Sequence, residues 1–254
     1  MNEENKISVV INTYNAEQHL EQVLQAVDGF DEVLICDMES TDGTLDIARR
    51  HGCKIVTFPK ENHHIVEPAR EFAIHQVSHP WVLVVDADEI VTKELKACLY
   101  DKIETPDVAD GYYISRCNQF LGRYTLVRGR DYILRFFRHA ITTWPPTIHS
   151  VPVVKGRVER LPEQYEIMHL ADETIQQWVR KMNDYTDYEV EKKKDRHFGV
   201  CALFWRPFWR FVKNYFLMGG IRNGRRGLLQ SLQWAIYQQI LISKIIEKRL
   251  REKA

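Results

Sequence analysis

The chain has 254 residues, equal numbers of acidic and basic side chains, and five cysteines. Its length allows one domain with an appendage. No apolar run is long enough to predict a transmembrane helix. An odd number of cysteines without C-x-x-C spacing argues against a disulfide framework, and the polar, acidic first residues are unlike a signal peptide. We therefore expect a protein of a reducing compartment, the cytoplasm.

The first sixty residues predict alternating strands and helices. Residues 7–13 predict a strand, and Asn15 with Gln18 three positions later is typical of a helix N-cap followed by a capping box. Residues 32–37 predict a second strand, which ends at Asp37. A short helix over residues 44–51 and a third strand over residues 54–58 follow.

The alternation continues to residue 103. Glu67-Pro68 begins a helix with proline at the first helical position, where the missing N–H is tolerated. Residues 81–85 are apolar, as in a strand buried on both faces, and a last helix runs from Thr92 to residue 103. Right-handed crossovers between such strands predict an α/β fold with a mostly parallel sheet and helices on both faces. The G-x-G-x-x-G and P-loop patterns are missing from the sequence, which disfavours dinucleotide and P-loop chemistry.

Three carboxylates, Asp86, Asp88 and Glu89, follow the strand over residues 81–85 directly. The carboxyl ends of strands in open α/β sheets are where ligands bind. Carboxylates this close repel one another, and a divalent cation would neutralise them. Hard oxygen ligands favour magnesium, manganese or calcium, with substrate phosphates completing the shell. The alternative is that Asp86 caps the next segment while Asp88 and Glu89 are solvated loop residues.

Four segments in order resemble the nucleotide-sugar half of family two inverting glycosyltransferases of the GT-A fold. They are residues 9–15 (VVINTYN), 37–44 (DMESTDGT), 67–70 (EPAR) and 86–89 (DADE). The second departs from the family pattern, which has aspartate and glycine where this chain has Met38 and Glu39. Further segments resemble the branch that adds sugars to the lipopolysaccharide inner core, namely residues 118–123, 134–138, 148–150 and 215–220. That branch usually has glutamate after the histidine, where this chain has Ser150.

The resemblance implies roles for the residues in these segments. Asp37 would accept the uracil N–H, Thr13 and Tyr14 would line the base pocket, and Arg70 would reach the pyrophosphate, for which a guanidinium fork is suited. Asp86 would face the ribose, Asp88 would bind Mg²⁺ or Mn²⁺, and Glu89 would brace the loop. The expected donor-binding set is Thr13, Tyr14, Asn15, Asp37, Arg70, Asp86 and Ala87, with Arg135 and Arg138 as further candidates for acceptor or phosphate binding.

An inverting transfer also needs a base for the acceptor hydroxyl. The candidates are Asp131, which precedes an apolar strand over residues 132–134, and His149. We favour Asp131 slightly. The alternatives are that Asp131 pairs with Arg128 or Arg130 and that His149 is a hydrogen-bonded structural residue.

The charge is divided unevenly. Residues 192–254 contain 15 Lys and Arg against 3 Asp and Glu, a net charge of +12, and the preceding residues carry −12. Aromatic and basic residues alternate in this tail, among them Trp205, Arg206, Trp209, Arg210 and Lys213, which predicts attachment to an anionic membrane surface. The alternative is that these helices pack on the sheet domain and about half of the rings are core. An apolar helical stripe is expected at Leu229, Leu232, Ile236, Ile240 and Ile246.

We expect residues 1–170 to form the GT-A domain, with a nucleotide-sugar half (1–109) and an acceptor half (110–170), and residues 171–254 to form a helical, membrane-associating region. The predicted activity is metal-dependent, inverting transfer of a hexose from a UDP-glucose type donor to lipopolysaccharide core or a lipid-linked acceptor, on the inner face of the cell membrane. The alternatives are a catalytically silent module that binds nucleotide sugar or glycolipid and, disfavoured by the acidic first part, a nucleic-acid-binding protein.

Overall fold

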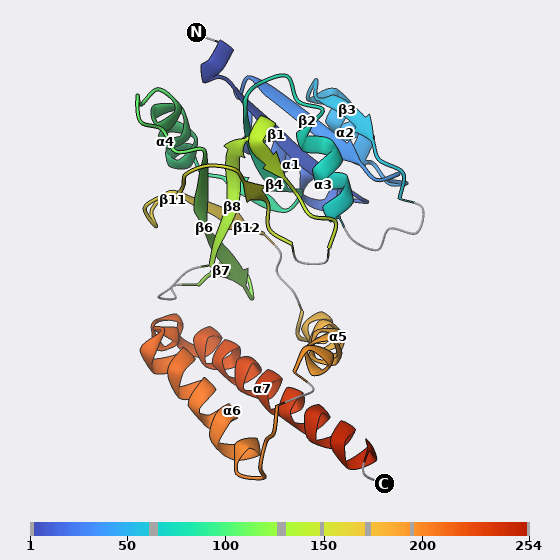
Figure 1. Ribbon diagram of the computed structural model, residues 1–254, viewed down its shortest axis with the longest axis vertical. Coiled ribbons are helices and arrows are strands. Elements are labelled where there is room, and N and C mark those ends of the chain that lie inside the picture. Colours follow the sequence, from blue (N-terminus) through green and yellow to red (C-terminus); the bar gives the residue numbers. More distant parts are fainter. Residues whose placement is uncertain are drawn as a thin grey trace. The chain divides into compact units, whose positions relative to one another are not determined.

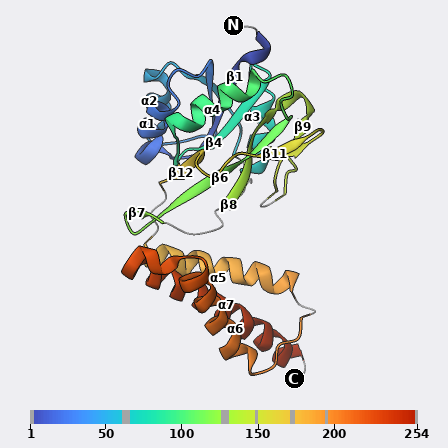
Figure 2. The same cartoon turned by 90° about the vertical axis from the view of Figure 1, so that its left-hand side faces the viewer.

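The computed structural model describes residues 3–60, 66–125, 131–147, 150–170, 174–193 and 196–252. The chain divides into two compact units, which are treated separately below. The first comprises residues 1–117 and 130–170, and the second comprises residues 118–129 and 171–254. The two views in Figures 1 and 2 show the sheet of the first unit and the helices of the second.

The first unit is built on one mixed sheet. Its parallel part has the order β3-β2-β1-β4, with β1 (Ile7–Thr13), β2 (Glu32–Asp37), β3 (Lys54–Thr57) and β4 (Trp81–Asp86). The predicted parallel arrangement is therefore confirmed. Antiparallel strands extend the sheet beyond β4: β8 (Asp131–Arg138) pairs with β4, and β6 (Gly111–Phe120) pairs with β8.

Short strands complete this architecture. The order continues from β6 to β12 (Glu166–His169) and ends at β5 (Glu89–Val91), with β12 and β5 antiparallel. β11 (Val158–Arg160) pairs with β6, and β7 (Arg123–Tyr124) pairs with the end of β6. A separate pair is formed by β9 (Thr142–Thr143) and β10 (Val153–Val154).

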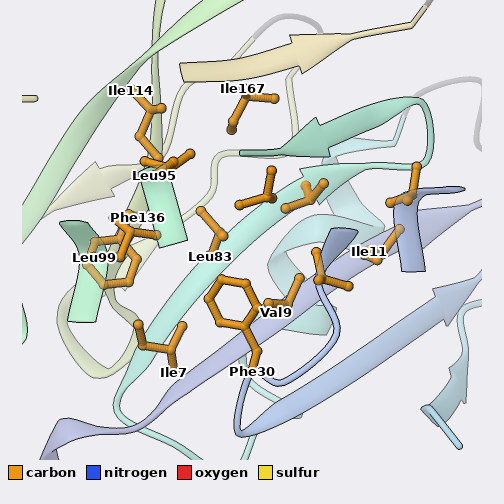
Figure 3. Close-up of a cluster of buried hydrophobic side chains, with 14 of the residues drawn as sticks. Ile7, Val9, Ile11, Phe30, Leu83, Leu95, Leu99, Ile114, Phe136 and Ile167 are labelled. Carbon is orange, nitrogen blue, oxygen red and sulfur yellow. The ribbon is translucent and has the colours of Figure 1, made fainter. Parts of the chain in front are cut away.

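Helices cover both faces of the sheet, as predicted. One core cluster includes apolar residues of α1 (Glu17–Ala26), α2 (Thr44–Arg50) and α4 (Lys93–Ile103). Figure 3 shows Leu95 and Leu99 of α4 beside strand residues such as Leu83 and Phe136. The cluster on the other face includes Ala69, Ala73 and Ile74 of α3 (Glu67–Ile74). β1 and β4 are covered on both sides, which explains why their sequences are nearly continuous apolar runs.

The helix starts follow the sequence signals with one exception. Thr92 caps α4 by accepting a hydrogen bond from Leu95 N, and proline lies in the first turn of α3. The prediction that Asn15 caps the next helix is wrong, because α1 begins at Glu17 and Ala16 precedes it. Asn15 has φ of 49°, and its side-chain oxygen accepts from Thr41 N at 2.8 Å instead. The side chain thus ties two loops together.

The second unit contains three long helices, α5 (Ile175–Lys192), α6 (Ala202–Val212) and α7 (Gly224–Glu252). α6 and α7 run side by side in both views and are joined by a π-helical turn over Lys213–Leu217 and a 3-10 turn over Gly220–Asn223. Arg226 Nε donates to Leu121 O at 2.8 Å, which attaches the end of the β6–β7 hairpin to the start of α7. Within the described residues, no helix is both long enough and apolar enough to cross a bilayer.

The predicted apolar stripe of α7 is wrong in part. Leu229, Leu232 and Ile236 are exposed, whereas the apolar residues that α7 buries are Leu241, Ile242 and Ile245. Two of these pack with Val190 of α5. The helix therefore buries its second half on α5 and exposes apolar side chains in its first half.

Candidate active site

The carboxyl ends of three neighbouring strands bring the first group of site residues together. The register pairs Thr13 with Asp37 and Asn12 with Asp86, so the ends of β2, β1 and β4 lie at one edge of the sheet. This is the edge at which open α/β sheets bind ligands. The turns after β1 and β4 carry Tyr14, Asn15 and Ala87, whereas Arg70 lies on α3.

Asp37 is held rigidly at the end of β2. Its side chain is buried, one carboxylate oxygen accepts from Thr13 Oγ1 at 2.8 Å, and the other accepts from Ser40 N at 2.8 Å. A carboxylate offers about four lone-pair sites, so these bonds leave capacity for a further donor. Tyr14 is exposed beside it, with Lys60 Nζ 3.1 Å from the centre of its ring.

Asp86 at the end of β4 lies between two arginines. Arg135 Nη2 donates to Asp86 Oδ2 at 2.6 Å, and Arg70 Nη2 donates to the other oxygen. Burial opposes ionisation of this carboxyl, but the two guanidinium charges outweigh it and lower the pKa of Asp86. The site therefore holds an aspartate that is ionised near neutral pH and paired with two cations.

A β-bulge explains how Arg135 reaches Asp86. The pairing of β6 with β8 moves from Tyr112–Phe136 directly to Tyr113–Leu134, so Arg135 is the extra residue of β8. Bulges re-aim side chains and occur often beside active sites. Arg138, in contrast, pairs with Trp81 at the opposite end of β4 and lies 3.8 Å from Asp110. The structure does not bring Arg138 to the edge that holds Asp86.

Glu89 supports the turn after β4. Its side chain is fully buried, and its Oε2 accepts from Asp86 N at 2.9 Å. Burial and the neighbouring Asp86 charge both raise the pKa of Glu89. Ala87 lies in this turn and packs on the first core cluster.

Asp88 is the most accessible carboxylate of the turn and faces a histidine that the sequence reasoning missed. The Asp88 Oδ2 to His169 Nε2 distance is 3.3 Å, with 37% of the Asp88 side chain exposed. Burial opposes protonation of His169, but the Asp88 hydrogen bond and charge outweigh it and raise the pKa. His169 ends β12, which pairs with β5 so that His169 faces Glu89. Only this long-range pairing reveals it.

Of the two predicted bases, only Asp131 lies in the described part of the chain; His149 lies outside it. Asp131 begins β8, and Arg116 Nη2 of β6 donates to its Oδ2 at 2.8 Å. Its predicted alternative partners, Arg128 and Arg130, lie outside the described residues. Arg116 Nη1 is also 3.8 Å from Glu89 Oε1. Arg116 thus links Asp131 to the turn after β4, a role that no short motif in the sequence indicates.

The residues of this turn fit a divalent cation in one arrangement. Asp88 could supply one carboxylate oxygen, which suits both magnesium and manganese. His169 could supply one imidazole nitrogen, which suits magnesium less well. No cluster of three or more metal-binding side chains is present in the ranges that the structure describes. Two protein ligands leave most of the coordination shell to water and substrate, as is usual where phosphates share the metal.

Comparison with known proteins agrees with this geometry. Residues 8–154 match the model of glycosyl transferase family 2. The lipopolysaccharide core biosynthesis glycosyltransferase LpsC of Rhizobium meliloti is 26% identical over 95% of this chain and 92% of its own length. An uncharacterised glycosyltransferase of Rickettsia typhi is also 26% identical, over 98% of this chain and 89% of its own.

A solved structure shares the fold. The structure of S. aureus TarS 1-349 in complex with UDP-GlcNAc matches with a TM-score of 0.55 at 14% identity and covers 97% of this chain and 92% of that one. Since the family match spans more than half of the sequence and includes the strands that carry Asp37, Asp86 and Arg135, the chain belongs to glycosyl transferase family 2 and is a glycosyltransferase of the GT-A fold.

Proposed function

We propose that this glycosyltransferase transfers a hexose, with inversion, from a UDP-sugar of the UDP-glucose type to a lipopolysaccharide core or other lipid-linked glycan. The observation that carries the proposal is the edge at which Asp37, Asp86 and Asp88 end or follow neighbouring strands. The relative named for lipopolysaccharide core biosynthesis, similar over nearly the whole chain, supports the acceptor class. The likeness in fold to a structure with UDP-GlcNAc supports the donor class.

In this proposal the donor lies across the edge from β2 to β4. Asp37, held by Thr13 and Ser40, accepts the uracil N–H, and Thr13 and Tyr14 line the base pocket. The ribose lies toward Asp86, and the diphosphate lies toward Arg70 and Arg135, whose guanidinium groups suit phosphate oxygens. The pairing of these arginines with Asp86 fixes their orientation before the donor binds.

A divalent cation, Mg²⁺ or Mn²⁺, would be held by Asp88 and His169 and would stabilise the charge that develops on the departing nucleoside diphosphate. Glu89 contributes by fixing the backbone of the turn. Release of nucleoside diphosphate in the presence of manganese, measured with a panel of nucleotide sugars, tests the proposal. Release from a UDP-hexose supports it, whereas binding without any release would favour the alternative of a catalytically silent module.

The acceptor base is proposed to be Asp131. Its side chain is 55% exposed beside the turn that carries Glu89, and Arg116 orients it. Asp131→Asn is therefore expected to lower kcat by about 10²–10⁴-fold, the range for loss of a general base, with little change in donor affinity. His149→Ala serves as the comparison and is expected to cost less. Near-full kcat in both variants would place the base elsewhere.

We also propose that the second unit attaches the enzyme to an anionic membrane surface. Four aromatic residues of α6 are strongly exposed: Phe204 (72%), Trp205 (62%), Phe208 (56%) and Trp209 (49%). The rings of Trp205 and Trp209 stack at 6.4 Å, which follows from their spacing of one helical turn. Within the second unit, these four rings therefore lie outside the core. Arg206, Arg210 and Lys213 supply positive charge on the same segment, and interfacial tryptophan with basic residues is typical of headgroup binding.

Replacing Trp205 and Trp209 by serine is expected to release the protein from anionic vesicles, because the two rings supply apolar area that the charges alone do not. Raising the salt concentration should act in the same direction. Co-sedimentation with anionic and neutral vesicles is the measurement, and Tyr188→Ser, which removes an exposed ring of α5, is a control. Activity on a soluble, truncated acceptor should persist. Equal binding to both kinds of vesicle would contradict an electrostatic role, and a change in oligomeric state on mutation would indicate a second copy as the partner instead.

A further inference from the structure

A buried tryptophan lies against the two arginines of the site. Trp144 follows β9, is 3% exposed, and its ring centre is 5.1 Å from Cζ of Arg70 and 5.7 Å from Cζ of Arg135. Both distances are within the range of cation–π attraction, for which tryptophan is the strongest partner. One aromatic ring thus contacts both cations that bind Asp86.

These three residues come from separate parts of the fold. Arg70 belongs to α3, Arg135 is the bulged residue of β8, and Trp144 follows the short strand β9. The backbone of Trp144 is fixed as well, since its N–H donates to Glu71 Oε2 at 2.5 Å. Because the three residues come from different elements, tertiary structure sets the position of the ring. In that position the ring lies against both guanidinium groups.

The arrangement leaves hydrogen-bond donors unused. Arg70 Nε and Arg135 Nη1 are shielded from solvent and have no acceptor among the described residues. The charges of Glu89 and Asp88 also act on Arg135 but occupy neither of these donors. The aromatic ring attracts both cations without accepting their N–H bonds, so the two donors stay available. Buried donors without an acceptor favour a ligand that supplies acceptor oxygens, and guanidinium groups suit those of a phosphate.

We propose that Trp144 is a positioning residue that holds Arg70 and Arg135 in the orientation required to bind a diphosphate. The proposal rests on the assignment of a nucleotide-sugar donor to this edge. The role proposed for Trp144 concerns only binding of the diphosphate and does not depend on which base or sugar the donor carries. The competing explanation is that Trp144 only fills the second core cluster, where it contacts Phe137 edge-on at 6.4 Å.

The experiment compares three variants by calorimetric titration with UDP and with inorganic pyrophosphate. Trp144→Leu removes the aromatic face and is expected to weaken both affinities about tenfold, equivalent to about 1.4 kcal/mol, and to raise the donor KM more than it lowers kcat. Trp144→Phe keeps an aromatic face and is expected to remain within about threefold of wild type. Phe72→Leu is the matched control, since it loosens the same cluster and its ring contacts Phe58. Should Trp144→Leu fail to fold, Trp144→Met gives the same comparison, because methionine has a similar volume but a flexible side chain that adapts to an irregular gap.

Wild-type affinity in Trp144→Leu, or equal loss in Phe72→Leu, would overturn the positioning role in favour of packing. Failure of the wild-type protein to bind either UDP or pyrophosphate would overturn it as well. Binding of pyrophosphate but not UDP would reject the uridine donor and would still support the role of Trp144 in diphosphate binding. The donor proposal and the Trp144 proposal therefore fail separately. Thermal melting of each variant separates loss of affinity from loss of fold.

Discussion

Asp88→Ala is expected to abolish sugar transfer and to leave the fold intact. The side chain lies on a turn, is partly exposed, and faces His169 as its polar partner. The backbone bond that fixes this turn, from Leu170 N to Asp88 O at 2.7 Å, does not depend on the side chain. Loss of the carboxylate would therefore remove a cation ligand without unfolding the turn.

The measurement is nucleoside diphosphate release and nucleotide affinity, each with manganese and with chelator. Wild type should lose affinity when the cation is chelated, whereas Asp88→Ala should have the low affinity under both conditions. His169→Ala should show the same pattern in milder form. Glu94→Ala, an exposed carboxylate in the first turn of α4, is the control and should behave as wild type. Turnover by Asp88→Ala at the wild-type rate in chelator would reject the metal site.

Asp86→Asn is expected to have the largest effect on stability. Removing the charge leaves Arg70 and Arg135 without their shared counter-ion, and breaking a buried pair in this way costs about 3 kcal/mol or more. Asp131→Asn also breaks an arginine pair, but one whose carboxylate is 55% exposed, and exposed pairs contribute about 1 kcal/mol at most. Urea unfolding of the two variants should therefore differ clearly in midpoint.

The dependence on pH follows from the lowered pKa of Asp86. A carboxyl group whose folded pKa lies below its unfolded value, about 3.9, stabilises the fold above that value. This contribution is lost as the pH falls toward the folded pKa. The stability difference between wild type and Asp86→Asn should be full near neutral pH and should shrink progressively below about pH 4. A difference that stays constant down to acidic pH would contradict the ionised pair.

The sequence predicted correctly those parts of the site that depend on a single strand and the segment directly after it. The apolar run before Asp86 and the cap at Thr92 are local signals, and both predicted their elements correctly. Sequence reasoning missed His169, Arg116 and Trp144, which reach the site through antiparallel strands or connections whose register no local pattern encodes. The error at Asn15 has a related cause. Capping residues also favour loop conformations, and a contact with a distant loop determined which of the two was adopted.

The last strand pair of the sheet determines how much of the chain the chemistry needs. The family match ends at residue 154, but His169 belongs to β12, and β12 is the strand that holds β5 with Glu89 in the sheet. A fragment cut at the end of the match would expose the hydrogen-bonding edge of β5 and leave the turn at Asp88 without its histidine. We therefore expect the shortest active fragment to extend through Leu170, so that β12 can pair with β5.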